Sequence, residues 1–124
     1  MKKVLIVEDE KVLLAALTAS FKRTEIKVLT AQDGDQGLHV ALQKHPHLIL
    51  LDLVMPKMDG ITMLHKLRKD DWGKDVKVII LTNLTDQKKA AEAARDNVYD
   101  YFIKSNWNIK DVIKRVQTEL KKMD

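Results

Sequence analysis

The sequence predicts an α/β fold, in which a doubly wound parallel sheet of five strands alternates with helices. Three observations predict it. Short runs of Val, Ile and Leu recur along the chain, and such near-continuous apolar runs are typical of parallel strands buried on both faces. Between them, apolar residues recur at helical spacing. Pro46, Pro56 and the glycines fall at segment boundaries, as turn residues do. We therefore expect right-handed βαβ units in a single sheet.

The expected strands are short. They lie at residues 4–7, 26–29, 48–53, 76–81 and 101–103. Four helices are expected from apolar stripes at Leu13, Leu14, Leu17 and Phe21; at Leu38, Ala41 and Leu42; at Ile61, Leu64 and Leu67; and at Ile109, Val112, Ile113, Val116 and Leu120. The remaining helix, at residues 86–96, has mainly alanine as its apolar content. It buries little area, so we expect it to be held loosely.

Length and composition indicate one soluble globular domain over residues 1–124. The chain is 45% hydrophobic and 32% charged, which is ordinary for a soluble protein. No apolar stretch approaches the roughly 18 residues of a transmembrane helix, so no membrane insertion is expected. The apolar run at residues 4–7 is too short for an export signal. The absence of cysteine fits a reducing compartment, so we expect a cytoplasmic protein.

The formal net charge is +4, but its distribution does not favour nucleic-acid binding. A basic cluster with aromatic or polar side chains that read bases would be expected for that function. The nearest candidate cluster is Lys110, Lys114, Arg115, Lys121 and Lys122. Because acids are interspersed along the same half of the chain, a solvated helix face is the favoured interpretation.

Carboxylates, a hydroxyl and an ammonium group stand at the ends of four of the apolar runs. The first run is followed by Glu8 and Asp9, the third contains Asp52, the fourth is followed by Thr82 and the fifth by Lys104. In open α/β sheets, ligands bind beyond the carboxyl ends of the strands. Each residue alone has a structural explanation, such as capping a helix. Together at one edge, they favour a functional site.

The chemistry of this set can be argued from its charges. Three carboxylates in a small volume repel one another, and a hard divalent cation with oxygen ligands, such as Mg²⁺, offsets that repulsion. An Asp carboxylate such as Asp52 can attack phosphorus and form an acyl phosphate. Lys104 would supply a fixed positive charge, and Thr82 could donate a hydrogen bond to the phosphoryl group. Phosphoryl transfer needs mainly such positioning and charge neutralisation.

These residues carry a resemblance to a known family. The segment from Leu50 to Gly60, together with Glu8-Asp9, Thr82 and Tyr101-Phe102-Ile103-Lys104, resembles the receiver domain of bacterial two-component response regulators. The resemblance covers nearly all 124 residues. It implies a flavodoxin-like (βα)₅ fold with strand order 2-1-3-4-5, a single receiver domain of the chemotaxis-regulator kind, and no output domain in this chain.

The resemblance also implies a role for each residue of the site. Asp52 would be phosphorylated from a phosphohistidine on a sensor histidine kinase or a histidine phosphotransfer protein. Mg²⁺ would be bound directly by Asp9 and Asp52, through water by Glu8, and by the backbone carbonyl of Val54.

The same resemblance implies a conformational switch. Lys104 would contact the phosphoryl group, Thr82 would move towards it, and Tyr101 would rotate inward behind Thr82. The surface made by the fourth helix, fifth strand and fifth helix would then change its affinity for a downstream effector protein, and a homodimer could form through it. Such a protein is not a conventional enzyme, because its chemistry is phosphoryl acceptance and slow hydrolysis on its own side chain.

Two positions differ from the usual family pattern. Ser105 follows Lys104, where the family usually has proline, often after a cis bond; a cis bond before a non-proline residue costs about 2.5–4 kcal/mol. Asn83 follows Thr82, where a small residue is usual. We expect these changes to retune the gain and loss of phosphate. They also leave open a degenerate receiver that binds partners without phosphorylation.

Two other functions fit the sequence less well. A Mg²⁺-dependent phosphohydrolase would usually carry a second acid two residues after its nucleophile, and Val54 stands there. A flavin-binding domain would need a phosphate-cradling loop after the first strand, where Glu8, Asp9 and Glu10 would repel a phosphate. The histidines, which lack zinc-ligand spacing, are expected in surface or turn roles: His39, His45, His47 and His65.

Overall fold

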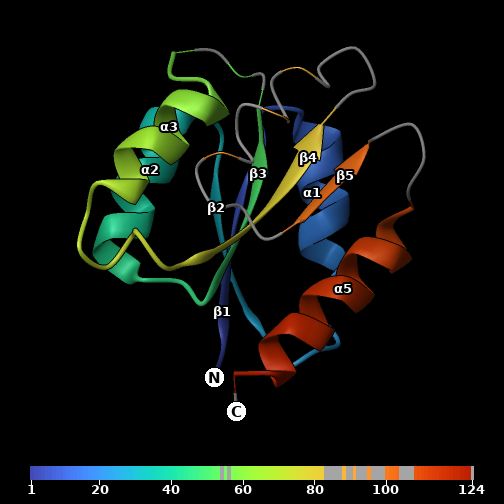
Figure 1. The fold of residues 1–124 in the computed structure, drawn as a ribbon. Coiled ribbons are helices and arrows are strands. Elements are labelled where there is room, and N and C mark those ends of the chain that lie inside the picture. Colours follow the sequence, from blue (N-terminus) through green and yellow to red (C-terminus); the bar gives the residue numbers. More distant parts are fainter. Residues whose placement is uncertain are drawn as a thin grey trace.

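The structure is a computed structural model that describes residues 1–53, 55, 57–82, 88, 91, 95, 100–103 and 108–123, with the backbone alone at 82 and 100–103. The chain alternates strands and helices, as shown in Figure 1. The strands are β1 (Lys3–Val7), β2 (Lys27–Ala31), β3 (Leu48–Asp52), β4 (Lys77–Thr82) and β5 (Asp100–Ile103). The helices are α1 (Lys11–Ser20), α2 (Gly34–Lys44), α3 (Gly60–Arg68) and α5 (Ile109–Lys121).

The five strands form one parallel sheet in the order β2-β1-β3-β4-β5. This confirms the predicted fold class and strand order. The sequence-based strand limits differ from the observed ones by one or two residues, because hydrogen bonding in the sheet and burial do not end at the same residue. The strand predicted at 26–29, for example, is observed at Lys27–Ala31.

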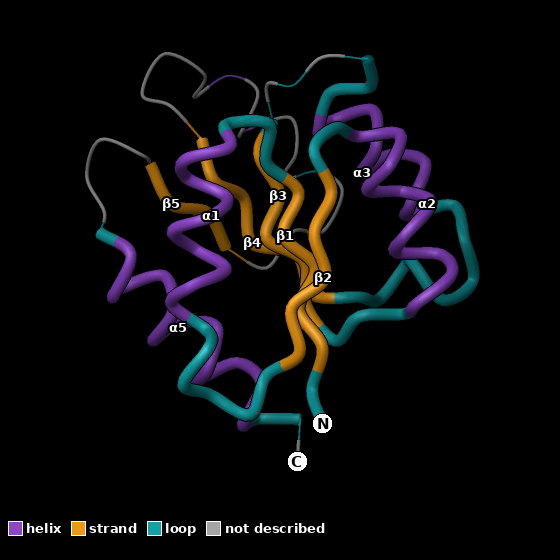
Figure 2. The backbone as a smooth tube through the Cα atoms, turned by 180° about the vertical axis from the view of Figure 1, so that it is seen from behind, coloured by secondary structure: helices purple, strands orange, loops and turns teal. Residues whose placement is uncertain are grey.

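Helices cover both faces of the sheet, with α2 and α3 on one face and α1 and α5 on the other (Figure 2). Alternate residues of β3 serve the two cores: Ile49 and Leu51 face α2 and α3, whereas Leu48 and Leu50 face α1 and α5. All five residues of β3 are buried. A strand buried on both faces can carry polar groups only at its ends, which restricts where a site can form.

The apolar stripe predicted for α2 is only partly buried. Leu42 is 37% exposed, whereas Ala41 is fully buried. Close packing against the sheet depends instead on Gly37, where an added Cβ would lie 2.9 Å from the Val7 side chain and 3.0 Å from Met63 Sδ. The prediction from helical spacing assumes that large apolar side chains mark the packed face of a helix. At Gly37, α2 lies so close to Val7 and Met63 that no large side chain would fit.

Three helices begin with a side-chain cap. Asp33 accepts a hydrogen bond from the Gln36 amide at the start of α2, and Asp59 accepts one from the Thr62 amide at the start of α3. Asn108 does the same for α5, accepting from the Asp111 amide. Such caps satisfy amides that have no partner inside the helix. They fix where each helix starts relative to the strand before it.

The amino ends of β1 and β3 are held together by His47. The Lys3 amide donates to His47 Nδ1 at 3.0 Å, and the His47 amide donates to the Lys3 carbonyl at 2.8 Å. Nearby, His45 stacks on Trp72 with ring centroids 4.3 Å apart. Both histidines lie at the end of β3 opposite Asp52, where the sequence places them.

A buried acid near the end of α5 was not predicted. Glu119 is fully buried and pairs with Lys77 at 3.5 Å, Arg115 at 3.5 Å and Lys122 at 3.2 Å. Two members of the basic cluster singled out in the sequence, Arg115 and Lys122, therefore neutralise a buried carboxylate. A Glu or Asp side chain is rarely fully buried unless cations pair with it in this way. The contact ties α5 to the first residue of β4.

Several sequence predictions fall on positions that the structure does not describe. They include most of the expected helix at 86–96, and also Asn83 and Ser105. Within the described part of the chain, no helix has the length and apolar character needed to cross a membrane.

Acidification is expected to destabilise the fold through His47. Burial, followed by the positive charges of Lys2 and Lys3, lowers the pKa of His47 below its ordinary 6.5. The folded state therefore binds fewer protons than the unfolded state, so its stability is fully present above pH 6.5 and falls as the pH drops towards the lowered folded pKa. Urea unfolding between pH 7.5 and 5.5 should show this slope. In His47→Asn, whose amide oxygen can still accept from Lys3, the slope should be smaller; an unchanged slope would rule out His47 as its source.

Candidate metal and phosphoryl site

The site forms because β1 and β3 are neighbours in a parallel sheet. Val7 at the end of β1 lies opposite Leu51, one residue before the end of β3. Glu8 and Asp9 directly follow β1, and Asp52 is the last residue of β3. The Glu8 amide donates to the Ala31 carbonyl at 3.0 Å, which continues the β1–β2 pairing one residue past β1. Sheet register therefore brings the three acids to one edge.

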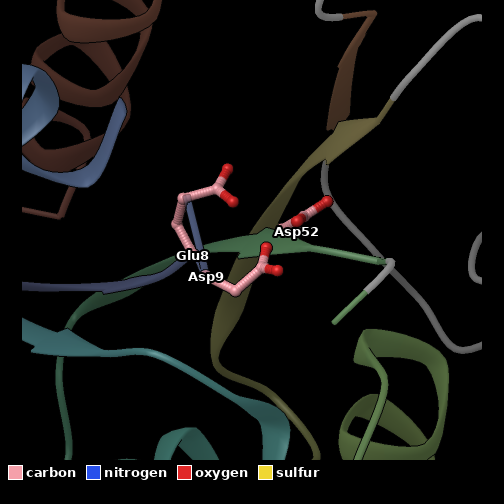
Figure 3. A group of neighbouring side chains, drawn as sticks. All are labelled: Glu8, Asp9 and Asp52. Atoms are coloured by element: carbon pink, nitrogen blue, oxygen red, sulfur yellow. The ribbon is translucent and has the colours of Figure 1, made fainter. Parts of the chain in front are cut away.

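The three carboxylates gather in a small volume, as Figure 3 shows. One oxygen from each of Glu8, Asp9 and Asp52 lies within 4.8 Å of the others. Glu8 is fully buried, Asp52 is 3% exposed and Asp9 is half-buried. Glu8 Oε2 also accepts a hydrogen bond from the Glu10 amide at 3.2 Å, which orients this carboxylate at the start of α1. Negative charge is thus concentrated where little water can screen it.

The donor set fits a hard divalent cation. All three ligand atoms are carboxylate oxygens, and Mg²⁺ typically takes one or two carboxylates, waters and a phosphate. Oxygens around an octahedral Mg²⁺ at about 2.1 Å from the metal lie roughly 3–4 Å apart. Three carboxylate oxygens that all lie within 4.8 Å of one another are therefore close enough to share one such cation.

The loop after Asp52 is held by close contacts between backbones. A Cβ added at Gly60 would lie 2.3 Å from the Asp52 carbonyl oxygen and 2.8 Å from Leu53 Cα. The Gly60 amide donates to the Leu53 carbonyl at 2.9 Å. Gly60 belongs to the segment that carries the family resemblance, but only the structure shows its steric reason: α3 starts directly against the strand end that bears Asp52.

The second anchor of this loop comes from α2. The Gly34 amide donates to the Met58 carbonyl at 2.9 Å, and a Cβ at Gly34 would lie 2.1 Å from the same oxygen. Lys57 has a left-handed φ of 64° and pairs with Asp33 at 3.7 Å. Neither contact was predicted, because each depends on α2 and the loop after β3 lying side by side.

The other predicted site residues are described only in part. The backbone of Thr82 ends β4 and pairs with Ile103, and the backbone of Tyr101 pairs with Ile80. Thr82 is thus at the same edge of the sheet as Asp52, whose partner in β4 is Leu81. Lys104 and Val54 lie outside the described residues, so the structure places neither side chain.

Comparison with known proteins identifies the class of this domain. Residues 4–117 match the family model described as the response regulator receiver domain. The receiver domain of a Francisella response regulator has a TM-score of 0.88 and 29% identity, with each chain covered completely. The chain belongs to the response regulator receiver domain family, which is homologous to phosphorylation-switched two-component regulators.

Two further comparisons give a solved receiver domain of similar fold and a longer curated relative. One is the receiver domain of a sensor histidine kinase from Pseudomonas aeruginosa, which was solved with a magnesium ion coordinated in its active site cleft. Its TM-score to this chain is 0.83 and its sequence identity is 24%. The match covers 94% of this chain and 95% of that one. The DNA-binding dual master transcriptional regulator RpaA of Synechocystis is 30% identical over the whole chain. The chain spans about half the length of the first curated relatives it matches.

Removing one of the three acids should relieve repulsion. Without divalent cations, Asp9→Asn is expected to raise the free energy of unfolding by about 1 kcal/mol or more, because one charge pair near 4 Å is worth about 1 kcal/mol in bulk water and more where water screens it less. Added Mg²⁺ should stabilise the wild type by mass action and the variant much less. Thermal melts in EDTA and in Mg²⁺ would test this, with Asp35→Asn, an exposed acid in α2, as the control. An equal response of all three proteins to Mg²⁺ would contradict it.

Enlarging Gly60 should disturb the site through the backbone. Gly60→Ala is expected to lower the free energy of unfolding by about 1–3 kcal/mol, the usual cost of overpacking, because the clash is with backbone atoms at Asp52 and Leu53. Urea unfolding measures the loss. Thr62→Ala, an exposed position two residues later in α3, should change it by less than about 0.5 kcal/mol. Equal stability of Gly60→Ala and the wild type would mean that the loop adapts freely.

Proposed function

We propose that this domain is a phosphorylation-controlled switch that accepts a phosphoryl group on Asp52 in the presence of Mg²⁺. The observation that carries the proposal is the convergence of Glu8, Asp9 and Asp52 within 4.8 Å at the carboxyl edge of the sheet. The family supports it, because its members include phosphorylation-switched regulators. The Mg²⁺ requirement is supported by the three carboxylate oxygens of the site. We propose Asp9 and Asp52 as direct ligands, Glu8 as a ligand through water and the Val54 carbonyl as a further ligand.

The proposed reaction uses the Asp52 carboxylate as nucleophile. An Asp52 oxygen attacks the phosphorus of a phosphohistidine, the P–N bond breaks, and the histidine nitrogen leaves with the bonding electron pair and takes up a proton. An acyl phosphate is formed on Asp52. A bound Mg²⁺ would neutralise the charge of the transferred group. Beyond charge neutralisation, phosphoryl transfer needs mainly the correct position of the nucleophile. The close backbone packing of Gly60 against Asp52 and Leu53 fixes the position of Asp52.

We further propose that Lys104, Thr82 and Tyr101 read the phosphorylation state. Thr82 ends β4 beside Asp52, and Lys104 directly follows β5, which pairs with β4. A hydroxyl and an ammonium at these positions suit a phosphoryl group on Asp52. Movement of Thr82 and inward rotation of Tyr101 would change the surface made by residues 86–96, β5 and α5. Effector binding, or dimerisation, would respond there.

The protein's partners and place in the cell follow from this function. We propose a sensor histidine kinase or histidine phosphotransfer protein as the phosphodonor and a downstream protein as the effector, in the cytoplasm. Although relatives are named as DNA-binding regulators, this chain spans only half their length, and we assign no direct DNA contact to its residues. We class the domain as a phosphoryl acceptor that catalyses only its own phosphorylation by the donor and its own dephosphorylation, and not as an enzyme with turnover. The retained acids give no support to a phosphorylation-independent receiver.

Phosphorylation can be tested with a small donor. Incubation with acetyl phosphate and Mg²⁺ should add one phosphate, seen by intact mass, that is stable in acid and labile in base. Asp52→Asn should abolish it because the nucleophile is gone, whereas Asp35→Asn should label normally. EDTA should prevent labelling. A phosphate that persists in Asp52→Asn, or no labelling of the wild type, would sink the proposal.

A further inference from the structure

A second site is suggested at the edge of the sheet opposite the acids. An open cleft of about 640 Å³ lies between the start of β1, the loop from α1 to β2, the start of β3 and the end of α5. Its volume is in the range of small-molecule sites. Its chemistry is set by the polar side chains that line it: Lys2, Arg23, Glu25, His47, Gln117 and Lys121.

The charge of this cleft is positive. Lys2, Arg23 and Lys121 line it, whereas Glu25 is the single acid among the described residues that do so. These cations come from three separate elements, so they converge through tertiary structure and do not form the solvated face of one helix. Arg23 and Lys121 are exposed, so a ligand can reach them from solvent. Ile26 and Leu120 add apolar surface to the same cleft.

The pKa of His47 supports a positive potential there. Burial is the first cause of its lowering, and the charges of Lys2, Lys3 and the terminal amine add to it. Since like charges disfavour the protonated form, the lowered pKa shows that the imidazole lies in the field of these positive groups. His47 Nδ1 is occupied by the Lys3 amide, so the contribution of His47 to a ligand would come through its other nitrogen.

We propose that this cleft binds a small phosphate-bearing molecule. Among the described residues, three cations and one acid line the cleft, so charge complementarity favours a multiply charged anion. A phosphate matches the guanidinium of Arg23 and the amines of Lys2 and Lys121. The apolar side chains allow an organic group to be attached to the phosphate. Because β1 separates Lys2 from Glu8, the ligand is held roughly 17 Å or more from the acids, so binding there needs no divalent cation.

The proposal can be tested by NMR in EDTA, so that phosphate cannot be captured through Mg²⁺ at the acids. AMP and, separately, inorganic phosphate are titrated into the isotope-labelled protein. Saturable shifts are expected at residues 23–26, at the His47 ring and at residues 117–121. Arg23→Glu combined with Lys121→Glu should weaken binding by roughly tenfold or more, which is 1.4 kcal/mol. The matched control, Lys66→Glu with Lys69→Glu, makes the same charge change at exposed positions in and just after α3.

Each outcome decides between two conclusions. Tighter binding of AMP than of phosphate supports an organic phosphate as ligand, and equal affinities support the free anion. No saturation with either probe would overturn the proposal. Equal weakening in the two double variants would do so as well, since it would show that only net charge matters. Circular dichroism of both variants establishes that each is folded, so that a loss of binding is a property of the cleft.

Discussion

Burial of the parallel sheet on both faces is the constraint on which the rest of this structure depends. Every residue of β3 is buried, so polar chemistry can only be placed where strands end. The adjacency of β1 and β3 then places Glu8, Asp9 and Asp52 within 4.8 Å of one another. Their mutual repulsion is what a divalent cation would offset. The close approach of the three carboxylates therefore opposes folding when no metal is bound and favours binding of a divalent cation.

The two edges of the sheet have opposite character. At the carboxyl edge, the acids stand beside a loop held by close backbone contacts at Gly34 and Gly60. At the amino edge, His47 joins β1 to β3, and Glu119 joins α5 to Lys77 at the start of β4. Because α5 is anchored at this far edge, we expect any movement linked to phosphorylation to be concentrated at the carboxyl ends of β4 and β5.

Much of the fold could be predicted because its causes are local. Apolar runs of strand length and stripes at helical spacing follow from burial, and they predict the order of the elements. The same rules were wrong for Leu42, which is 37% exposed, because α2 approaches the sheet through Gly37. They also missed Glu119, since a charged residue near a helix end normally faces water. Both failures concern how closely two elements pack, which no local pattern records.

The sequence by itself determined which residues can carry the chemistry: an acid pair after the first strand, Asp52 at the end of the third, and the segment after it that identifies the family. It did so because strand ends are readable from apolar runs, and polar residues there have few structural reasons to coincide. Only the tertiary structure decided how near the three carboxylates lie, that Gly60 starts α3 against the Asp52 backbone, and that Lys2, Arg23 and Lys121 line one cleft. Those facts depend on strand adjacency and on contacts between segments far apart in the chain, which the order of residues does not specify.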